Sequence, residues 1–202
     1  MKQYRTDTRA RLTKVARSLL SVHGCDGTAL DDVLVATGVS KGAFYHYFKT
    51  KDSLCMEVLT DVIAEYKKLC ESVDKNLDPV AQLRFLVTKL IELNASGQWV
   101  NCRLILKFSA EAYEGKPMLQ QKIQEFWDWY TNFYGEIVKQ AQAAGQFRND
   151  IEPAVQGRLL TTLMAGSITL EKVPGPDVAT IDLMNIVIES LKPRAKDRML
   201  QD

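Results

Sequence analysis

Apolar residues recur at helical spacing along almost the entire chain. Near the N-terminus Leu12, Val15 and Leu19 fall on one face, which predicts an amphipathic helix over residues 6–23. The sequence shows no run of strict two-residue alternation, so strands are not expected. The pattern therefore predicts an all-α fold of about nine helices. The further helices are expected over residues 28–37, 41–47, 51–74, 79–96, from 101, 117–144, 153–172 and 177–191.

Two of these helices are short and are separated by the turn Thr37-Gly38-Val39-Ser40. Gly38 ends the first, and Ser40 can cap the second because its hydroxyl accepts a hydrogen bond from an amide of the first turn. Two short helices joined by a turn with glycine are typical of a helix-turn-helix. The sequence thus predicts a helix-turn-helix DNA-binding domain over residues 1–50, followed by a larger helical domain over residues 51–202.

The second helix of this motif divides its residues between two sides. Phe44, Tyr47 and Phe48 share one face and are expected to anchor the helix to its neighbours. A recognition helix contacts base edges with its first residues, which must be small or polar, while its far side is held by packing. The remaining residues suit a major groove: Lys41, Gly42, Ala43, Tyr45 and His46.

Several groups around this helix are candidates for contacts with the DNA backbone. Tyr45, His46 and Lys51 would reach phosphate oxygens with their side chains. The amides near Thr28 and Ser40 would do the same, because helix starts present unpaired N–H groups. On pattern alone, the stretch could instead be a tightly packed helix pair in an unrelated helical protein.

Charge is distributed unevenly along the 202 residues, although the net charge is only +1. Residues 1–52 contain nine Lys and Arg against five Asp, a local charge of +4, which leaves the rest at −3. A basic N-terminal part favours contact with nucleic acid. It argues against a helical adaptor that binds only protein, which we keep as an alternative of a different class.

Four cysteines lie far apart, without the paired spacing of a zinc site or a dithiol redox motif: Cys25, Cys55, Cys70 and Cys102. Reduced thiols, no metal and no cofactor are therefore expected. The N-terminus offers no apolar run of signal-peptide length and no later segment approaches the length of a membrane span. These features predict a cytoplasmic protein without membrane contact.

Catalysis is not expected. His23 and His46 are the only histidines, and no nucleophile, paired-carboxylate or phosphate-cradling motif surrounds either of them. The chain is interpreted as a protein that is not an enzyme.

Residues 28–54 resemble the TetR family of transcriptional regulators. The resemblance consists of a threonine at the start of the second helix, a Gly-Val-Ser turn, Lys-Gly before Tyr-His-Tyr-Phe, and Lys-Asp at the fourth helix. It implies an all-α homodimer that usually represses transcription. The helix over residues 41–47 of each subunit, called the reader below, would enter one of two successive major grooves of a palindromic operator, and residues 51–202 would form an effector-binding and dimerisation domain. Ala43 departs from the serine or threonine of many relatives, and its methyl could touch a thymine methyl instead.

The last two helices are candidates for the dimer interface. One apolar stripe contains Val155, Leu159, Leu163, Gly166 and Leu170. A second contains Ile181, Met184, Ile188 and Leu191. The core of a monomeric bundle would produce the same stripes, so the dimer interpretation depends mainly on the resemblance.

An aromatic segment that precedes these two helices, residues 125–138, is a candidate wall of an effector pocket. Its aromatic residues include Trp127, Tyr130, Phe133 and Tyr134. Tyrosine and tryptophan offer an apolar wall together with a polar atom. A stripe of this kind can equally be core, and a sensor of non-reactive apolar ligands remains an alternative.

Cys102 lies at the start of the expected sixth helix, beside Arg103, where the helix dipole favours a thiolate. A lone buried cysteine is usually inert. However, residues 97–111, which include Trp99 and Phe108, and residues 166–172 resemble TetR-type repressors that respond to electrophiles such as N-ethylmaleimide and quinones. The resemblance implies that Cys102 reacts with the effector, with Lys172 near it.

Overall fold

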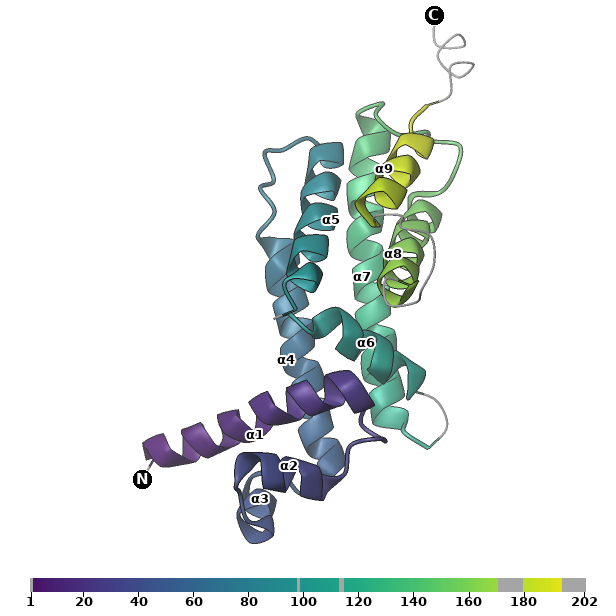
Figure 1. Ribbon diagram of the computed structural model, residues 1–202. Helices are drawn as coiled ribbons and strands as arrows, with labels where there is room; N and C mark the ends of the chain where they lie inside the picture. The colour runs from purple at the N-terminus through teal and green to yellow at the C-terminus, as the bar shows by residue number, and fades with distance from the viewer. Residues whose placement is uncertain (1, 98, 113–114, 171–179, 194–202) are drawn as a thin grey trace, which may run out of the picture. The chain divides into compact units, whose positions relative to one another are not determined.

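The computed structural model describes residues 2–97, 99–112, 115–170 and 180–193. Within them the chain forms nine α-helices and no strand (Figure 1). The first four are α1 (Lys2–His23), α2 (Leu30–Thr37), α3 (Lys41–Tyr47) and α4 (Lys51–Glu71). The others are α5 (Pro79–Ala95), α6 (Asn101–Ala110), α7 (Pro117–Ala143), α8 (Pro153–Leu170) and α9 (Thr180–Ser190). The expected all-α fold is confirmed.

Local sequence signals explain several of the helix ends. Gly38 ends α2 with φ of 64°, a left-handed conformation that glycine adopts without steric cost, and its amide donates back into the last turn. The carboxylate of Asp78 accepts hydrogen bonds from the amides of Val80 and Ala81, and Pro79 occupies the first position of α5. The start of α5 and the end of α2 therefore lie where these signals predict them. In contrast, α1 begins four residues before its predicted start and α4 ends three residues before its predicted end.

The chain divides into two compact units. The first contains residues 1–68 and 99–123, and so holds α1, α2, α3, α6 and most of α4. Its core is formed by side chains that are almost fully buried: Leu12, Ala16, Val33, Phe44, Leu54, Val58, Val62, Leu104 and Phe108. In this unit α1 packs against both α2 and α6. The expected boundary at residue 50 remains a prediction about domains.

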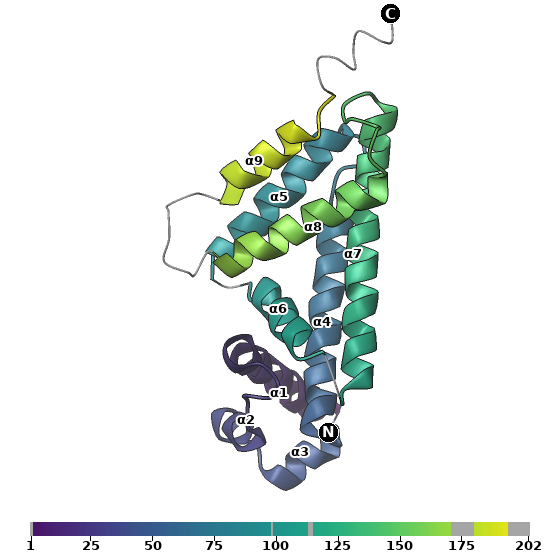
Figure 2. The same cartoon turned by 90° about the vertical axis from the view of Figure 1, so that its right-hand side faces the viewer.

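The second unit contains residues 69–98 and 124–202. Here α9 packs against α5 and α8, as Figure 2 shows. Helices α7 and α8 approach closely at two glycines: a Cβ on Gly157 would lie 2.7 Å from the backbone nitrogen of Gly135. Only glycine at position 157 permits this approach.

The two apolar stripes predicted for the last helices differ in their exposure. On α8, Val155, Leu159 and Leu170 are exposed. On α9, in contrast, Met184 and Ile188 are 1% exposed. They belong to the core of the second unit, and so does Leu191, which is 3% exposed just after the helix. The interface prediction was therefore wrong for the α9 stripe, because one chain already covers that face; its outward apolar residues are Leu183 and Ile186.

Within the part of the chain that the structure describes, no helix is long and apolar enough to cross a bilayer.

Candidate DNA-binding interface

Helix α3 is held from behind by two phenylalanines. Phe44 is fully buried and Phe48, which follows the helix, is 3% exposed, with their ring centroids 5.6 Å apart. Tyr47 is half-buried. A helix of seven residues is too short to be stable by itself, so this packing fixes its position. The anchoring role predicted for this face is confirmed for Phe44 and Phe48.

The opposite sides of α3 face solvent. Lys41, Gly42, Tyr45 and His46 are exposed and Ala43 is half-buried, and the side chain of Tyr45 keeps 48% of its accessible surface. The side chain of Ser40 accepts a hydrogen bond from the amide of Ala43 at 3.2 Å, which caps the helix as expected. The structure thus brings a cation, two residues without bulky side chains and two hydrogen-bonding rings onto one accessible surface.

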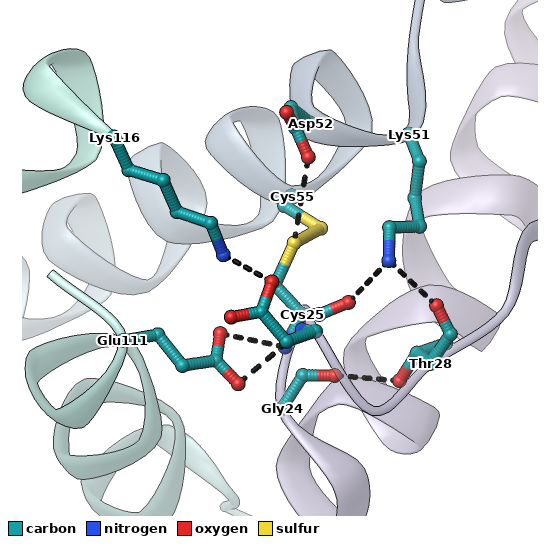
Figure 3. Close-up of polar contacts among 9 residues, drawn as sticks. Gly24, Cys25, Thr28, Lys51, Asp52, Cys55, Glu111 and Lys116 are labelled. Carbon is teal, nitrogen blue, oxygen red and sulfur yellow. Dashed lines mark hydrogen bonds and ion pairs between the residues drawn. A yellow bond between two sulfur atoms is a disulfide. The ribbon is translucent and has the colours of Figure 1, made fainter. Parts of the chain in front are cut away.

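The other two residues predicted to contact DNA already have partners within the chain. The Thr28 hydroxyl is buried and donates to the carbonyl of Gly24 at 2.6 Å. The Lys51 ammonium donates to the carbonyls of Cys25 and Thr28, at 2.5 and 2.9 Å (Figure 3). Both side chains therefore shape the loop before α2. Direct contacts of Thr28 and Lys51 with phosphate remain predictions.

A polar network in the first unit connects α1, α4 and α6. Arg17 of α1 donates to both carboxylate oxygens of Glu65 of α4, each at 2.6 Å, and also to the side chain of Asn101. Asn101 and Trp99 donate to the same carboxylate at 2.9 and 3.2 Å. Hydrogen bonds from Arg17, assisted by Asn101 and Trp99, lower the pKa of Glu65 to about 2, although partial burial acts in the opposite direction. Sequence patterns did not identify this network, because its members come from three separate segments.

Cys102 occupies the position next to this network. Its side chain is 2% exposed, and the Tyr66 hydroxyl of α4 donates to its sulfur at 3.0 Å. The ring of Tyr66 lies 5.1 Å from that of Trp99. Sulfur, tyrosine hydroxyl and indole are therefore gathered where α6 meets α4.

The remaining residues of the predicted effector site lie in separate parts of the structure. Phe108 is buried in the first unit, whereas the aromatic residues of α7 belong to the second. There Tyr130 and Tyr134 are buried with their hydroxyls 3.2 Å apart, and Trp127 and Phe133 are half-buried. Lys172 lies outside the described residues. A role of these residues in effector binding remains a prediction.

The expectation that all cysteines are reduced was wrong for one pair. Cys25, in the loop before α2, forms a disulfide with Cys55 of α4, with 6.3 Å between their Cα atoms (Figure 3). The two residues are 30 positions apart, so their pairing depends on how α4 packs beside the loop. Cys70 and Cys102 form no disulfide.

Comparison with known proteins agrees with this geometry. Residues 12–58, from α1 to the first half of α4, match the family of bacterial regulatory proteins described as the tetR family. The HTH-type transcriptional repressor DhaR of Mycobacterium sp. (strain GP1) is 24% identical over 195 residues, which cover 96% of each chain.

Solved structures share the fold over nearly the full length. The reduced form of E. coli NemR superposes with a TM-score of 0.77 at 18% identity, covering 92% of this chain and 96% of that one. AibR in complex with isovaleryl coenzyme A and operator DNA superposes with a TM-score of 0.71 at 19% identity, covering 92% and 98%.

Proposed function

We propose that this chain, a TetR-family DNA-binding transcriptional regulator, acts in the cytoplasm as a homodimeric repressor. A small-molecule or electrophilic effector releases it from a palindromic operator. The observation that carries the DNA-binding part is the division of α3, with Phe44 and Phe48 buried behind and Lys41, Tyr45 and His46 exposed in front. A rigid helix with an accessible polar front is what readout in a major groove requires.

Two copies of the chain are needed for specific binding, because one short reader makes few base contacts. In a symmetric dimer the two readers would contact half-sites about 34 Å apart, or a multiple of that distance. The exposed apolar residues of α8 and α9 provide a surface for pairing: Val155, Leu159, Leu170, Leu183 and Ile186. An exposed apolar patch is typical of an interface, and Val155 and Leu159 line one shallow surface pocket together.

Cys102 is the proposed point of effector action. The Tyr66 hydroxyl donates to the Cys102 sulfur, and Cys102 is in the first turn of α6, where unpaired amides point towards an added negative charge. Adjacent Asn101 bonds to both Arg17 and Glu65. A group added to the Cys102 sulfur would displace Tyr66 and disturb this network, and the displacement would pass to α1 and α4, which support the reader.

Operator binding is tested by gel shift with the DNA upstream of the protein's own coding region. The wild-type chain should bind with an affinity that falls steeply as salt rises. The variant Tyr45→Ala should bind much more weakly while unfolding at the same temperature, because the side chain is half exposed. Binding that is insensitive to salt and to this substitution would contradict the assignment.

Effector action is tested by repeating the gel shift with N-ethylmaleimide. The variant Cys102→Ser should still bind the operator and should no longer be released. Cys70→Ser is a matched control, because Cys70 is also buried and burial raises the pKa of its thiol to about 12. Release that persists in Cys102→Ser removes the proposed role of Cys102.

A further inference from the structure

The Cys25–Cys55 disulfide encloses the DNA-reading motif in a covalent ring. Cys25 precedes α2 and Cys55 lies in the second turn of α4, so the ring contains α2, the turn and the whole of α3. We propose that Cys25 and Cys55 form a reversible thiol–disulfide site that is oxidised by peroxides, and that its oxidation strengthens operator binding. The effect on the operator rests on the proposed DNA-binding function; the thiol chemistry does not.

The loop that carries Cys25 is held by polar contacts on several sides (Figure 3). The Glu111 carboxylate, just after α6, accepts hydrogen bonds from the amides of Cys25 and Asp26 at 2.9 and 3.3 Å. Lys116 forms an ion pair with Asp26, and Lys51 binds the carbonyl of Cys25. These contacts do not need the disulfide, so they would keep the two thiols close together after reduction.

Small reagents have a route to both sulfurs. Cys25 and Cys55 are only 3% and 4% exposed, but both line a cavity of about 490 Å³ in the first unit. Its other lining residues come from the start of α4, including Asp52, and from the start of α7 with the residues just before it, including Lys116. Peroxide is far smaller than this cavity, so the pair combines protection from large molecules with access for a small oxidant.

The chemistry requires one peroxide for each disulfide. The Cys55 thiolate attacks one oxygen of hydrogen peroxide, the O–O bond breaks, and the departing hydroxide is protonated to water, which leaves a sulfenic acid on Cys55. The Cys25 sulfur then attacks the Cys55 sulfur, and the hydroxyl leaves as a second water with the proton of the Cys25 thiol. The two thiols lose two electrons and the peroxide gains them.

Asp52 favours this division of roles. Its carboxylate lies 3.9 Å from the Cys25 sulfur and is placed to accept the proton of the Cys25 thiol during the second step. Cys55 is therefore assigned the thiolate that meets the oxidant, and Cys25 the thiol that attacks the sulfenic acid.

Oxidation would change the reader through its rigidity. With the bond closed, the segment before α2 cannot move away from α4, and the helix-turn-helix between them has fewer conformations to lose on binding DNA. With the bond open, that motion is resisted by the polar contacts and by apolar packing, including that of Phe44 and Phe48. The oxidised form should therefore hold the operator several-fold more tightly than the reduced form.

The thiol chemistry is tested on the full-length wild-type protein. The folded protein is reduced with dithiothreitol, freed of it, treated with hydrogen peroxide, denatured and alkylated with iodoacetamide, and its peptides are mapped by mass. Cys25 and Cys55 should both be alkylated before peroxide and linked to each other after it. A bond that dithiothreitol cannot open in the folded protein, or thiols that peroxide leaves unlinked, would overturn the proposal.

The effect on DNA is tested by fluorescence anisotropy with the same upstream DNA fragment. Peroxide should tighten binding several-fold in the wild type and in Cys102→Ser, and should leave Cys25→Ser and Cys55→Ser unchanged. Equal affinity of the reduced and oxidised wild type overturns the proposed coupling. A response that is lost only in Cys102→Ser would assign peroxide sensing to Cys102 and refute the role proposed for Cys25 and Cys55. An absence of operator binding in every variant and state would instead refute the DNA-binding function on which the coupling rests.

Discussion

Two segments of the chain are rich in aromatic residues, one in α3 and one in α7, and they differ in how far those residues are exposed to solvent. In α3, Phe44 is buried while Tyr45 and His46, which follow it directly, are exposed. In α7, Phe126, Tyr130 and Tyr134 form a buried stripe at four-residue spacing, and the rings between them are half-buried. The difference lies in the neighbours: α7 is 27 residues long and packs inside a bundle, whereas α3 has seven residues and is supported from one side.

This comparison shows that aromatic content alone does not identify a functional surface. The buried stripe of α7 stabilises the second unit through stacked and edge-on rings, such as Phe126 on Tyr130 with centroids 5.4 Å apart. The α3 cluster instead separates two tasks, because its buried rings fix the helix and its exposed rings remain accessible to a partner. A substitution should therefore affect stability or binding according to the face on which it lies.

The largest effect is expected for Phe44→Ala. The side chain is fully buried, so its truncation should lower the free energy of unfolding by about 3–5 kcal/mol. Chemical denaturation followed by circular dichroism measures the loss. Tyr45→Ala, the adjacent control, should leave the unfolding midpoint almost unchanged; equal losses for the two variants would break the division of α3 into two faces.

Gly157→Ala should have the next largest effect and tests how α7 is held. A Cβ there would lie 2.7 and 2.8 Å from Gly135 backbone atoms of α7, and the forced separation of the helices should cost about 1–3 kcal/mol. The matched control is Gly135→Ala on the opposite helix, whose Cβ would meet its nearest atom at 3.7 Å, an ordinary contact. Thermal unfolding of both variants should show a lower midpoint only for Gly157→Ala.

Glu65→Gln tests the polar network of the first unit, whose contribution to stability should depend on pH, unlike that of the uncharged aromatic clusters. Arg17 and its neighbours lower the pKa of Glu65 to about 2, below its unfolded value near 4.5. The group therefore adds stability that is present above pH 4.5 and is lost as the pH falls towards 2. Because the side chain is 43% exposed, solvent screening reduces the expected loss at neutral pH to about 1 kcal/mol.

Denaturation of the wild type and Glu65→Gln across pH 2–7 measures this difference. The two curves should converge as the pH falls through that window. Phe44→Ala provides the contrast. Because Phe44 is uncharged, its truncation should lower the free energy of unfolding by the same amount at every pH. A difference between Glu65→Gln and the wild type that does not depend on pH would mean that the carboxylate charge does not contribute.

The sequence predicted those features that depend on local signals. Ser40 and Gly38 mark the turn, and the spacing of Phe44 and Phe48 identifies the buried face of α3. It failed where separate segments meet. The stripe on α9 was assigned to an interface because periodicity identifies an apolar face without saying which chain covers it, and Met184 proved to be buried within this chain.

Contacts between distant segments gave no sequence signal. Cys25 and Cys55 are 30 residues apart, and neither has the short spacing by which disulfide or metal motifs are recognised. The Lys51 ammonium is predicted to reach a phosphate oxygen, and that contact remains a prediction. Within the chain it donates to carbonyls of the loop before α2, and only the packing of α4 beside that loop could reveal these partners.

Lys41→Ala should have the smallest effect on the fold and a specific effect on binding. The side chain is exposed at the first position of α3, so stability should not change measurably. If the ammonium contacts one phosphate in each reader, the slope of log affinity against log salt should become shallower by about 0.9 per reader. The control is Lys89→Ala on α5, which removes an equal charge from an exposed ion pair in the second unit. A slope that changes equally in both variants would mean that DNA affinity depends only on the net charge of the protein. A change confined to Lys41→Ala would locate the DNA contact on the exposed side of α3, opposite its buried rings.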